Sequence, residues 1–590
     1  MSKPTWSGMI GTVKEGIRVV ANDPSHNCKK AFSLAQNEYV ELREWLFNSA
    51  FPLWGTVGCD KDSGGFFEKI GKDVHPIDAL RRTRVVCRQI FSFAAAGRMG
   101  WPGDSAGAVA HGLRFLRQHC FQPNGSVRSA TDLQFGQHNE KFDLYDHAFA
   151  LFGLCAAYHV LPEKVELADK AVACLVAMKT GWGHYIAGFE EASPSVLPLR
   201  SNPHMHILEA CLAWAELGPE DKRSTWLRQA DEIAELCLSR FICVKTGAVR
   251  EYYDHDWNVD YDFPLAPVEP GHQFEWAWLL AKWGKLRGEK KALKAARRLV
   301  EIGEENGVCP NFRIAINGLD HNLEPVDKSF RLWPQTERIK AWLILAELSV
   351  APDDREFALG KVAEAGKGLK LFLSDVPDGL WRDRLTSNGT TIEEPVPASS
   401  LYHIVCAVEE LYNFFGERKN RRPALFLDRD GVIVKDIGYP GKIENIDLIE
   451  GAADAIRNFN ERDFHVFVVT NQSGIGRGYY DEDDYNVVRA HIKNVLRKQC
   501  AHIDDERASP FFTDAIDEKY RRYENWRKPN AGMIVDLMQE WNIDLEHSIL
   551  VGDKISDIHA ANAVGLKAEL FEGGSLSVFL ESLNLLGDCR

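Results

Sequence analysis

The feature that most constrains the fold is a polar or charged residue that recurs near the start of strongly apolar helical segments. Successive examples are separated by 59, 59, 66, 65 and 66 residues. Each interval holds two helices of ordinary length with their loops, so each unit is predicted to be a helical hairpin whose more apolar helix is internal. The six marker residues are Arg88, His147, His206, His272, Glu337 and His403.

Six such hairpins predict an all-α (α/α)6 toroid, with an open helical array as the alternative. Closure would place the markers around one cavity, because each lies near the same end of its inner helix. Imidazoles titrate near neutral pH and carboxylates can orient them, so this ring suits proton transfer. His272 and Glu275 are three residues apart and are expected to share a helix face. His147 fits a structural role equally well.

The sequence pattern changes near the charged segment GERKNRRP, at residues 416–423. Downstream, short apolar runs such as ALFLD, HVFVVT and SILVGD alternate with helical patterns. This alternation is typical of a parallel, Rossmann-like α/β sheet. We therefore predict two domains, at residues 1–417 and 423–590.

Carboxylates follow two of these apolar runs. Asp428 and Asp430 end the first predicted strand, and Asp553 follows the last. Ligands of open parallel sheets bind at the carboxyl ends of the strands. Two carboxylates separated by one residue indicate a candidate cation-binding site.

Composition excludes several functions for this chain of 590 residues. Its 85 acidic side chains outnumber 70 basic ones, for a formal net charge of -15, so nucleic acid is not an expected partner. No stretch reaches the roughly 18 apolar residues of a membrane helix, and no membrane partner is expected. The 13 cysteines include no Cys-x-x-Cys pair, and the first residues lack the apolar stretch of a signal peptide. We expect a reducing, cytoplasmic environment.

The long half resembles the N-acylglucosamine 2-epimerase superfamily over roughly residues 35–415. The segments that carry the resemblance are Asp60–Phe66, Cys87–Gln89, Asn202–His206, Pro270–Trp276, Arg331–Glu337 and Pro397–His403. The resemblance implies that His272 and His403 act as acid and base, with Glu275 supporting His272. It also implies that Arg88 and His206 contact sugar oxygens, and we expect Glu337 to line the same site.

Two reactions fit this residue set. An aldose and a ketose interconvert when a proton leaves the carbon next to the carbonyl and returns to its neighbour through an enediol, which needs one acid, one base and no metal or other cofactor. The N-P-H-M-H and S-S-L-Y-H segments look closer to the mannose/fructose isomerases of the superfamily. The alternative is 2-epimerisation of an N-acyl amino sugar.

The short half resembles the haloacid dehalogenase superfamily in its ordered D-x-D, Thr, Lys and G-D-x-x-x-D motifs. The resemblance implies phosphoryl transfer through an aspartyl-phosphate, with Asp428 as nucleophile and Asp430 as general acid and base. Mg2+ would be held by Asp428, the Asp430 carbonyl and Asp553, with Asp557 in an indirect role.

Other residues of this domain are expected to bind the substrate. Thr470 and Lys528 would hold the phosphoryl oxygens, and Asn471 and Arg527 are further substrate-binding candidates. The segments F-L-D-R-D-G-V-I, N-Q-S-G-I-G-R-G and R-K-P-x-x-G-M resemble the heptose bisphosphate phosphatase and histidinol-phosphatase subgroup. Many members carry a Cys/His zinc loop before R-K-P. Residues 511–526 contain neither Cys nor His, so zinc is not supported and a heptose bisphosphate substrate stays open.

Together, the halves predict a bifunctional enzyme whose partners are small sugars and sugar phosphates. The leading hypothesis is mannose/fructose isomerisation, on free sugars or their 6-phosphates, combined with Mg-dependent sugar-phosphate hydrolysis. Alternatives are an N-acyl amino sugar 2-epimerase fused to a phosphatase, or a carbohydrate-binding toroid that serves the phosphatase. The oligomeric state and the order of the two reactions stay open.

Overall fold

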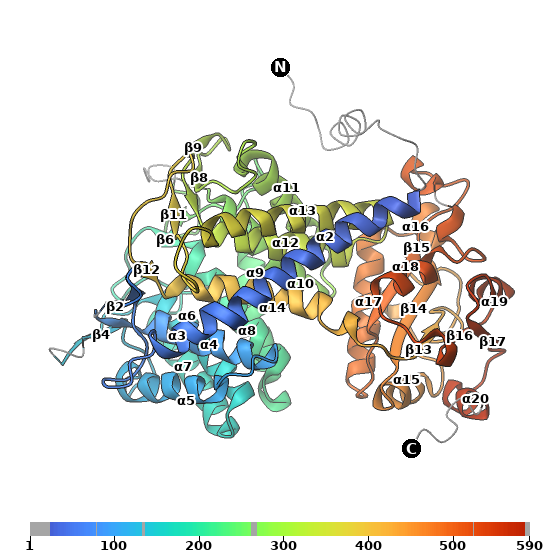
Figure 1. Ribbon diagram of the computed structural model, residues 1–590, viewed down its shortest axis with the longest axis horizontal. Coiled ribbons are helices and arrows are strands. Elements are labelled where there is room, and N and C mark those ends of the chain that lie inside the picture. The colour runs from blue at the N-terminus through green and yellow to red at the C-terminus, as the bar shows by residue number, and fades with distance from the viewer. Residues whose placement is uncertain (1–23, 78, 133–135, 261–267, 523, 584–590) are drawn as a thin grey trace.

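The computed structural model describes residues 24–77, 79–132, 136–260, 268–522 and 524–583. The parts of the predicted domains at 1–23 and 584–590 lie outside these residues. A helical domain and an α/β domain lie side by side (Figure 1). The last long helix of the first ends at Phe415, and the first strand of the second begins at Ala424.

Six inner helices form a closed ring, in which each packs against the next and the last packs back on the first. They are α4 (Thr83–Arg98), α6 (Leu144–Val160), α8 (Ser201–Leu217), α10 (Pro270–Arg287), α12 (Trp333–Leu348) and α14 (Ser399–Phe415). They are buried almost all round, as expected of helices enclosed by a second layer. The predicted (α/α)6 toroid is confirmed.

The outer layer covers this ring, and in it the first helix of the domain, α2, packs against α13. Its helices are α2 (Pro24–Trp45), α3 (Phe51–Thr56), α5 (Ser105–Phe115), α7 (Lys164–Trp182), α9 (Glu220–Leu236), α11 (Lys290–Gly307) and α13 (Pro352–Leu373). Short strands line one end of the toroid: β1 (Lys69–Ile70), β2 (Pro76–Ile77), β3 (Arg81–Arg82), β4 (Ala130–Asp132), β5 (Gln137–Asn139), β6 (Leu199–Arg200), β7 (Tyr252–Tyr253), β8 (Gly318–Leu319), β9 (Pro325–Asp327), β10 (Phe330–Arg331), β11 (Arg384–Leu385) and β12 (Val396–Pro397).

A repeated hydrogen bond ties four outer-to-inner connections to the inner helix that follows. In each, a backbone amide of the connection donates to a His or Gln side chain in the first turns of that helix. The pairs are Val127 with His147 at 3.0 Å, Phe189 with His204 at 3.0 Å, Val249 with Gln273 at 2.8 Å and Ala315 with Gln335 at 2.8 Å.

His147 therefore does not join the ring of markers at the toroid centre, and the prediction that all six meet there is wrong for this residue. Its Nδ1 bonds the Asp143 carbonyl oxygen at 2.8 Å, and its Nε2 accepts from the backbone. Burial lowers the pKa of His147 to about 4, which keeps the ring neutral. The residue two positions later, Phe149, occupies the repeat position of His206, Glu275 and Glu337.

The second domain is built on a five-stranded, fully parallel sheet in the order β15-β14-β13-β16-β17. Its strands are β13 (Ala424–Leu427), β14 (His465–Asn471), β15 (Asp505–Ser509), β16 (Ile549–Gly552) and β17 (Lys567–Leu570), and its helices are α15 (Ala452–Glu461), α16 (Ser473–Gly476), α17 (Glu482–Arg497), α18 (Gly532–Glu540), α19 (Ile555–Asn562) and α20 (Leu576–Ser582). Alternate residues of β13 enter two different apolar clusters: Leu425 lies in one and Phe426 in the other. Helices thus cover both faces, as the buried parallel strands require.

The α/β domain docks on the end of the toroid where the inner helices finish. The side-chain amide of Asn486 in α17 donates to the carbonyl of Leu348, the last residue of α12, at 2.8 Å. Gly288, directly after α10, lies near Ile443 and Val487 of the second domain. The beginnings of the inner helices therefore point away from the α/β domain, toward the end lined by short strands (Figure 1).

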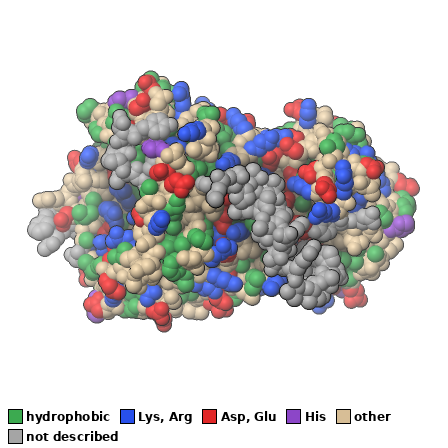
Figure 2. All heavy atoms as spheres, turned by 90° about the horizontal axis from the view of Figure 1, so that it is seen from above, with side chains coloured by type: hydrophobic (Ala, Val, Ile, Leu, Met, Phe, Trp, Pro, Cys, Tyr) green, Lys and Arg blue, Asp and Glu red, His purple; other side chains and the backbone are tan. Residues whose placement is uncertain are grey.

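Buried charges join the two domains. Glu540 of α18 pairs with Arg355 of α13, and it accepts hydrogen bonds at 2.7 Å from both Arg418 and Arg507. These side chains lie at the wall of a cavity of about 260 Å3 between the domains. By contrast, Figure 2 shows acidic and basic side chains interspersed over the outer surface seen there. Among the described helices, none combines the length and apolar character needed to cross a membrane.

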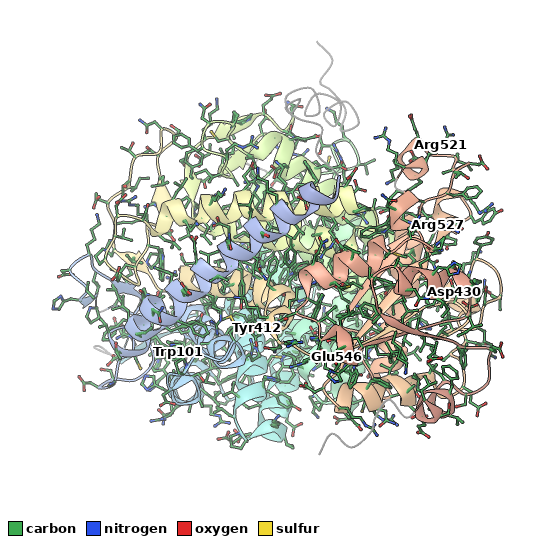
Figure 3. All side chains as sticks on the ribbon, turned by 45° about the vertical axis from the view of Figure 1, so that its right-hand side comes forward. Trp101, Tyr412, Asp430, Arg521, Arg527 and Glu546 are labelled. Atoms are coloured by element: carbon green, nitrogen blue, oxygen red, sulfur yellow. The ribbon has the colours of Figure 1, made fainter. Side chains whose placement is uncertain are left out.

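We predict that Glu540→Gln lowers the free energy of unfolding by about 3 kcal/mol, because it leaves buried arginines without their shared carboxylate. Scanning calorimetry of the full chain measures this change. Glu546→Gln is the matched control, since Glu546 lies exposed on the same domain (Figure 3). Equal stability of the two variants would contradict the assignment.

Candidate active sites

The first site lies at the toroid centre, where the inner helices begin. His272 of α10 and His403 of α14 both contact the indole of Trp333, with ring centroids 4.9 Å and 5.7 Å away. Both imidazoles are buried, at 6% and 8% side-chain exposure. The structure thus brings the two predicted acid/base residues to one place, against a shared aromatic ring.

His272 is held by two carboxylates. Its Nδ1 lies 2.9 Å from Glu251 Oε1 and 3.9 Å from Glu269 Oε2. Burial opposes the charge of this imidazole, but Glu251 and Glu269 outweigh burial and raise the pKa of His272 to about 10. At neutral pH His272 is therefore an imidazolium that can donate a proton.

His403 has the opposite electrostatic environment. Its Nδ1 lies 3.0 Å from Glu337 Oε1. Burial, together with the positive charges of Arg88 and Lys340, holds the pKa of His403 well below its ordinary value. His403 is therefore a neutral imidazole able to accept a proton. Two titratable groups whose environments separate their pKa values are the pattern of an acid/base pair.

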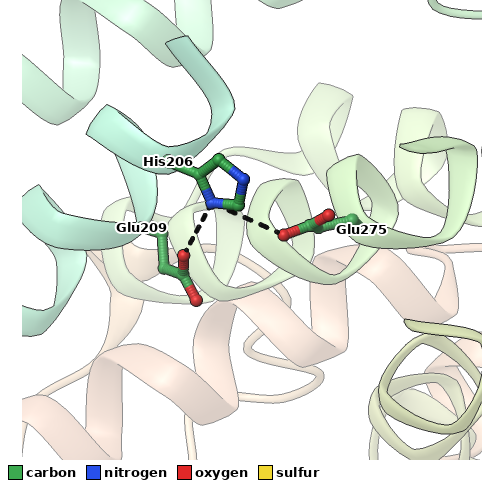
Figure 4. A group of neighbouring side chains, drawn as sticks. All are labelled: His206, Glu209 and Glu275. Carbon is green, nitrogen blue, oxygen red and sulfur yellow. Dashed lines mark hydrogen bonds and ion pairs between the residues drawn. The ribbon is translucent and has the colours of Figure 1, made fainter. Parts of the chain in front are cut away.

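Glu275, predicted to support His272, adds to the negative charges that raise the pKa of that imidazole, but no hydrogen bond or ion pair between the two is recorded among the described residues. Glu275 belongs to a buried group with His206 and Glu209, drawn in Figure 4. His206 Nδ1 lies 3.0 Å from Glu209 Oε2 and 3.7 Å from Glu275 Oε1. Helix geometry favours the same face for residues 272 and 275, but Glu251, which follows a β-bridge in a preceding connection, is closer to His272. Burial and the nearby Glu337 hold the pKa of Glu275 well above its ordinary value.

Glu209 is a further site residue that sequence reasoning missed. It lies three residues after His206, and its carboxylate also accepts from the hydroxyl of Tyr402 at 2.5 and 2.6 Å. The hydrogen bond from His206 opposes the effect of burial and lowers the pKa of Glu209 to about 2. The sequence did contain a signal for Glu209: it is an acidic residue inside an apolar run, one helical turn after the marker His206.

Arg88 reaches the same centre from α4. Its Nη2 donates to the hydroxyl of Tyr145 at 2.6 Å, and its guanidinium lies over the rings of Phe149 and Tyr402 at 4.3 and 5.0 Å. No ion pair of Arg88 with a carboxylate is recorded among the described residues. Its positive charge faces the centre and can hold an oxygen that gains negative charge.

The mouth of the toroid offers a second cationic group. Arg331 lines a cavity of about 290 Å3 together with Glu269, which also neighbours His272. Arg200, at the same end of the toroid, is paired with Glu191 at 2.5 Å. Arg331 is thus the better placed of the two to meet an anion at the mouth of the toroid.

The second site lies at the carboxyl ends of β13, β14 and β16. Lys528 is its central cation: its Nζ lies 3.1 Å from Asp428 Oδ1 and 2.6 Å from Asp557 Oδ1, and it donates to the Val469 carbonyl at 2.8 Å. Gly431 has φ +90°, and a Cβ there would lie 2.4 Å from Asp553 Oδ2, so only glycine lets this loop approach the carboxylate.

The side chain of Asp430 is bound by residues other than Lys528. Arg429 donates to both of its oxygens, at 2.8 and 2.9 Å, and Gln472 donates to Oδ2 at 2.8 Å. Gln472 also donates to the hydroxyl of Thr470 at 2.9 Å, which links Asp430 to the end of β14. Figure 3 places Asp430 and Arg527 on the part of the α/β domain away from the toroid.

Asn471 and Arg527 have different surroundings. The side chain of Asn471 accepts from the backbone NH of Lys528 at 3.1 Å and donates to its carbonyl at 3.0 Å, so it fixes the lysine loop. Arg527 donates to the Phe511 carbonyl at 3.4 Å and lies near Arg477, and burial together with Arg477 lowers its pKa. Two neighbouring guanidinium groups favour an anionic ligand.

Three carboxylates of this site form a group that fits a divalent cation. Oxygens of Asp428, Asp553 and Asp557 lie within 4.8 Å of one another, and Asp553 Oδ1 is buried without a hydrogen-bond partner. Burial and Asp428 raise the pKa of Asp553. An all-oxygen donor set is the type that Mg2+ prefers. Asp557, expected to act indirectly, is part of the group, whereas the side chain of Asp430 is not.

Fold and sites together define a fused sugar isomerase or epimerase and phosphatase. The model of the N-acylglucosamine 2-epimerase (GlcNAc 2-epimerase) family matches residues 65–407, and a HAD-hydrolase-like model matches residues 525–578. The chain belongs to the N-acylglucosamine 2-epimerase family, and its C-terminal domain belongs to the haloacid dehalogenase-like hydrolases.

Each half also has a relative that it matches over nearly the full length of that relative. A mannose-6-phosphate isomerase of Rhizobium meliloti is 43% identical over 375 residues, 63% of this chain and 96% of the relative. A D-glycero-beta-D-manno-heptose-1,7-bisphosphate 7-phosphatase of Rhodopseudomonas palustris is 41% identical over 163 residues, 28% of this chain and 91% of the relative.

Solved structures support the fold of the toroid. A cellobiose 2-epimerase from Bacillus thermoamylovorans B4167 aligns with a TM-score of 0.57 and 18% identity, over 63% of this chain and 98% of that one. A D-mannose isomerase aligns with a TM-score of 0.55 and 21% identity, over 67% and 100%. At these identities the likeness concerns the fold alone.

We predict that Glu251→Gln lowers the pKa of His272 from about 10, because the variant removes the nearest negative charge. An NMR titration of the His272 imidazole in the full chain measures the change. Glu191→Gln is the matched control, since Glu191 pairs with Arg200 at the same end of the toroid. An unchanged His272 titration in Glu251→Gln would refute this account of its charge.

Proposed function

We propose that the toroid is an aldose-ketose isomerase of the mannose/fructose type. The observation that carries this proposal is that His272 and His403 both contact Trp333, while carboxylates raise the pKa of His272 and burial with nearby cations lowers that of His403. The mannose-6-phosphate isomerase relative and the motifs around His206 and His403 favour isomerisation over 2-epimerisation.

The proposed chemistry uses the two imidazoles in turn. His403 takes the proton from C2 of the aldose while the His272 imidazolium protonates the C1 carbonyl oxygen, which gives an enediol. His272 then takes the proton from the C2 hydroxyl, and His403 returns its proton to C1, which yields the ketose and restores both groups. Arg88 and His206 are proposed to hold the oxygens whose charge changes during these steps.

A 6-phosphate is the proposed form of the sugar. Arg331 supplies a positive charge near Glu269, in a cavity open to the mouth of the toroid. A phosphate there would lie at the far end of the sugar from the reacting carbons.

The isomerase proposal predicts that the full chain converts fructose 6-phosphate to mannose 6-phosphate, and that His403→Ala and His272→Ala each lower kcat by about 100-fold or more, since each removes one partner in proton transfer. Proton NMR in D2O follows both conversion and deuterium uptake at the reacting carbons.

His147→Asn is the control for this prediction, because His147 bonds only backbone groups at the start of α6. Conversion of N-acetylmannosamine to its 2-epimer without ketose formation would replace the isomerase by the epimerase. Full activity of both histidine variants would favour a binding toroid.

We further propose that the α/β domain hydrolyses a sugar phosphate through an aspartyl-phosphate. Asp428 attacks phosphorus, and Asp430 protonates the leaving oxygen and later activates water. Lys528 and Thr470 bind the phosphoryl oxygens. Mg2+, held by Asp428, Asp553 and the Asp430 carbonyl, would offset the repulsion between carboxylate and phosphate. The Arg477 and Arg527 pair favours a substrate with further negative charge near the mouth.

The phosphatase proposal predicts that Asp428→Asn abolishes phosphate release, because an amide cannot form the acyl-phosphate bond, and that EDTA does the same until Mg2+ is restored. Free phosphate is measured with mannose 6-phosphate, fructose 6-phosphate and a heptose bisphosphate as substrates.

Asp454→Asn is the control, since Asp454 pairs with Arg457 on α15, outside the carboxylate group. Normal phosphate release by Asp428→Asn would reject the nucleophile. Activity on none of the three substrates would reject the substrate class.

A further inference from the structure

Lys340 lies deep in the toroid, one helical turn beyond Glu337 on α12. Its Nζ is 2.6 Å from Glu337 Oε2, and the side chains of both residues are fully buried. The other oxygen of the same carboxylate, Oε1, lies 3.0 Å from His403 Nδ1. Lys340, Glu337 and His403 thus form a continuous line of polar contacts that ends at the proposed base.

The surroundings of Lys340 keep it charged. Its ammonium lies 3.9 Å from the centroid of the Trp278 ring and 3.6 Å from Cys406 Sγ. Burial opposes the charge, but the neighbouring acids, Glu337 among them, hold the pKa of Lys340 well above its ordinary value. A buried ion pair is weak evidence for stability. The ion pair of Lys340 with Glu337 is therefore considered for its effect on the protonation of His403.

The charge of Lys340 decides which group holds a proton. Burial raises the pKa of Glu337, and Lys340 opposes that rise. While Glu337 is ionised, it accepts a hydrogen bond from His403 Nδ1-H, which leaves the lone pair on Nε2. Without Lys340, Glu337 would become a neutral acid that donates to Nδ1, and the imidazole proton would move to Nε2.

We propose that Lys340 is a positioning residue for the isomerase: it keeps Glu337 ionised and thereby holds His403 in the tautomer whose Nε2 can accept a proton. The inference rests on the proposed function, in which His403 is the base. It gives Glu337, first expected to bind substrate, the role of orienting His403.

Other titratable groups lie around His403 and its partner Glu337. They are Arg88 on α4, His206 and Glu209 on α8, Glu275 on α10, which lies near Glu337, and Tyr402 and Cys406 on α14. Arg88 and His206, like Lys340, disfavour an imidazolium, whereas Glu209 favours it. Lys340 also opposes the rise in the pKa of Glu275 and helps to lower that of Glu209, so the effect on Glu337 is isolated by comparing backgrounds with and without the Glu337 carboxylate.

The test compares Lys340→Met with Lys340→Arg in the full chain. For Lys340→Met we expect kcat at pH 7 to fall by about 100-fold, the scale of general base catalysis, with KM little changed. Because Glu337 then ionises only at higher pH, the activity should recover as pH rises, which shifts the acidic limb of the pH profile upward. Lys340→Arg should restore both kcat and the original profile.

A double variant separates this role from packing. In Glu337→Gln the amide oxygen still accepts from Nδ1-H and cannot ionise, so Lys340 loses its function there. We therefore expect Lys340→Met to change kcat by less than about 3-fold in the Glu337→Gln background, the usual sign of residues that act as one unit. An equally large loss in both backgrounds would overturn the proposal.

The tautomer is read directly from 15N shifts of labelled histidine without substrate, with His403→Gln used to assign the signal. Wild type should show Nδ1-H, and Lys340→Met at pH 7 should show Nε2-H. The same tautomer in both proteins would overturn the proposal, even if the isomerase assignment stands. A wild type that converts no sugar would instead reject the proposed function, while the NMR result still decides the role of Lys340. Phosphatase activity and thermal unfolding check that each variant is folded.

Discussion

The packing of α14 on α4 is the contact on which the toroid site depends. It joins residues more than 300 positions apart: Gln89 donates to the carbonyl of Ala398 at 2.8 Å, and Arg88 to that of Ser399 at 3.4 Å. This closure brings the guanidinium of Arg88 over Tyr402 and next to His403. In an open array, the first and last markers would face solvent at opposite ends, without the dry surroundings that shift their pKa values.

Within that closed ring, desolvation acts on every charge, and the placement of carboxylates decides the outcome. Glu251 and Glu269 make His272 a cation, whereas His403 shares the carboxylate of Glu337 with a lysine and stays neutral. Two imidazoles of the same chemical kind thus receive opposite protonation states. The difference in protonation comes from the charged groups around each imidazole, which lie away from the reacting carbons.

The sequence was sufficient to predict the toroid, the parallel sheet and most of the grouped residues, because helix spacing and strand-end carboxylates follow from backbone geometry. It left His147 open between the central ring and a structural role, because the sequence does not show that this histidine, two positions before Phe149 on α6, faces the connection and not the centre. Glu251 could not be assigned, because its proximity to His272 depends on how a connection folds back over α10. Lys340 reads as an ordinary helical lysine until Glu337 is seen between it and His403.

The docking of the α/β domain on the finishing ends of the inner helices has a kinetic consequence. The sugar site opens at the opposite end of the toroid, and Asp430 lies on the outer part of its own domain (Figure 3). A shared metabolite would therefore leave one half, mix with the surrounding pool and be recaptured by the other. Because both domains belong to one chain, they are produced in equal amounts. The catalytic rate of each domain can still change independently of the other.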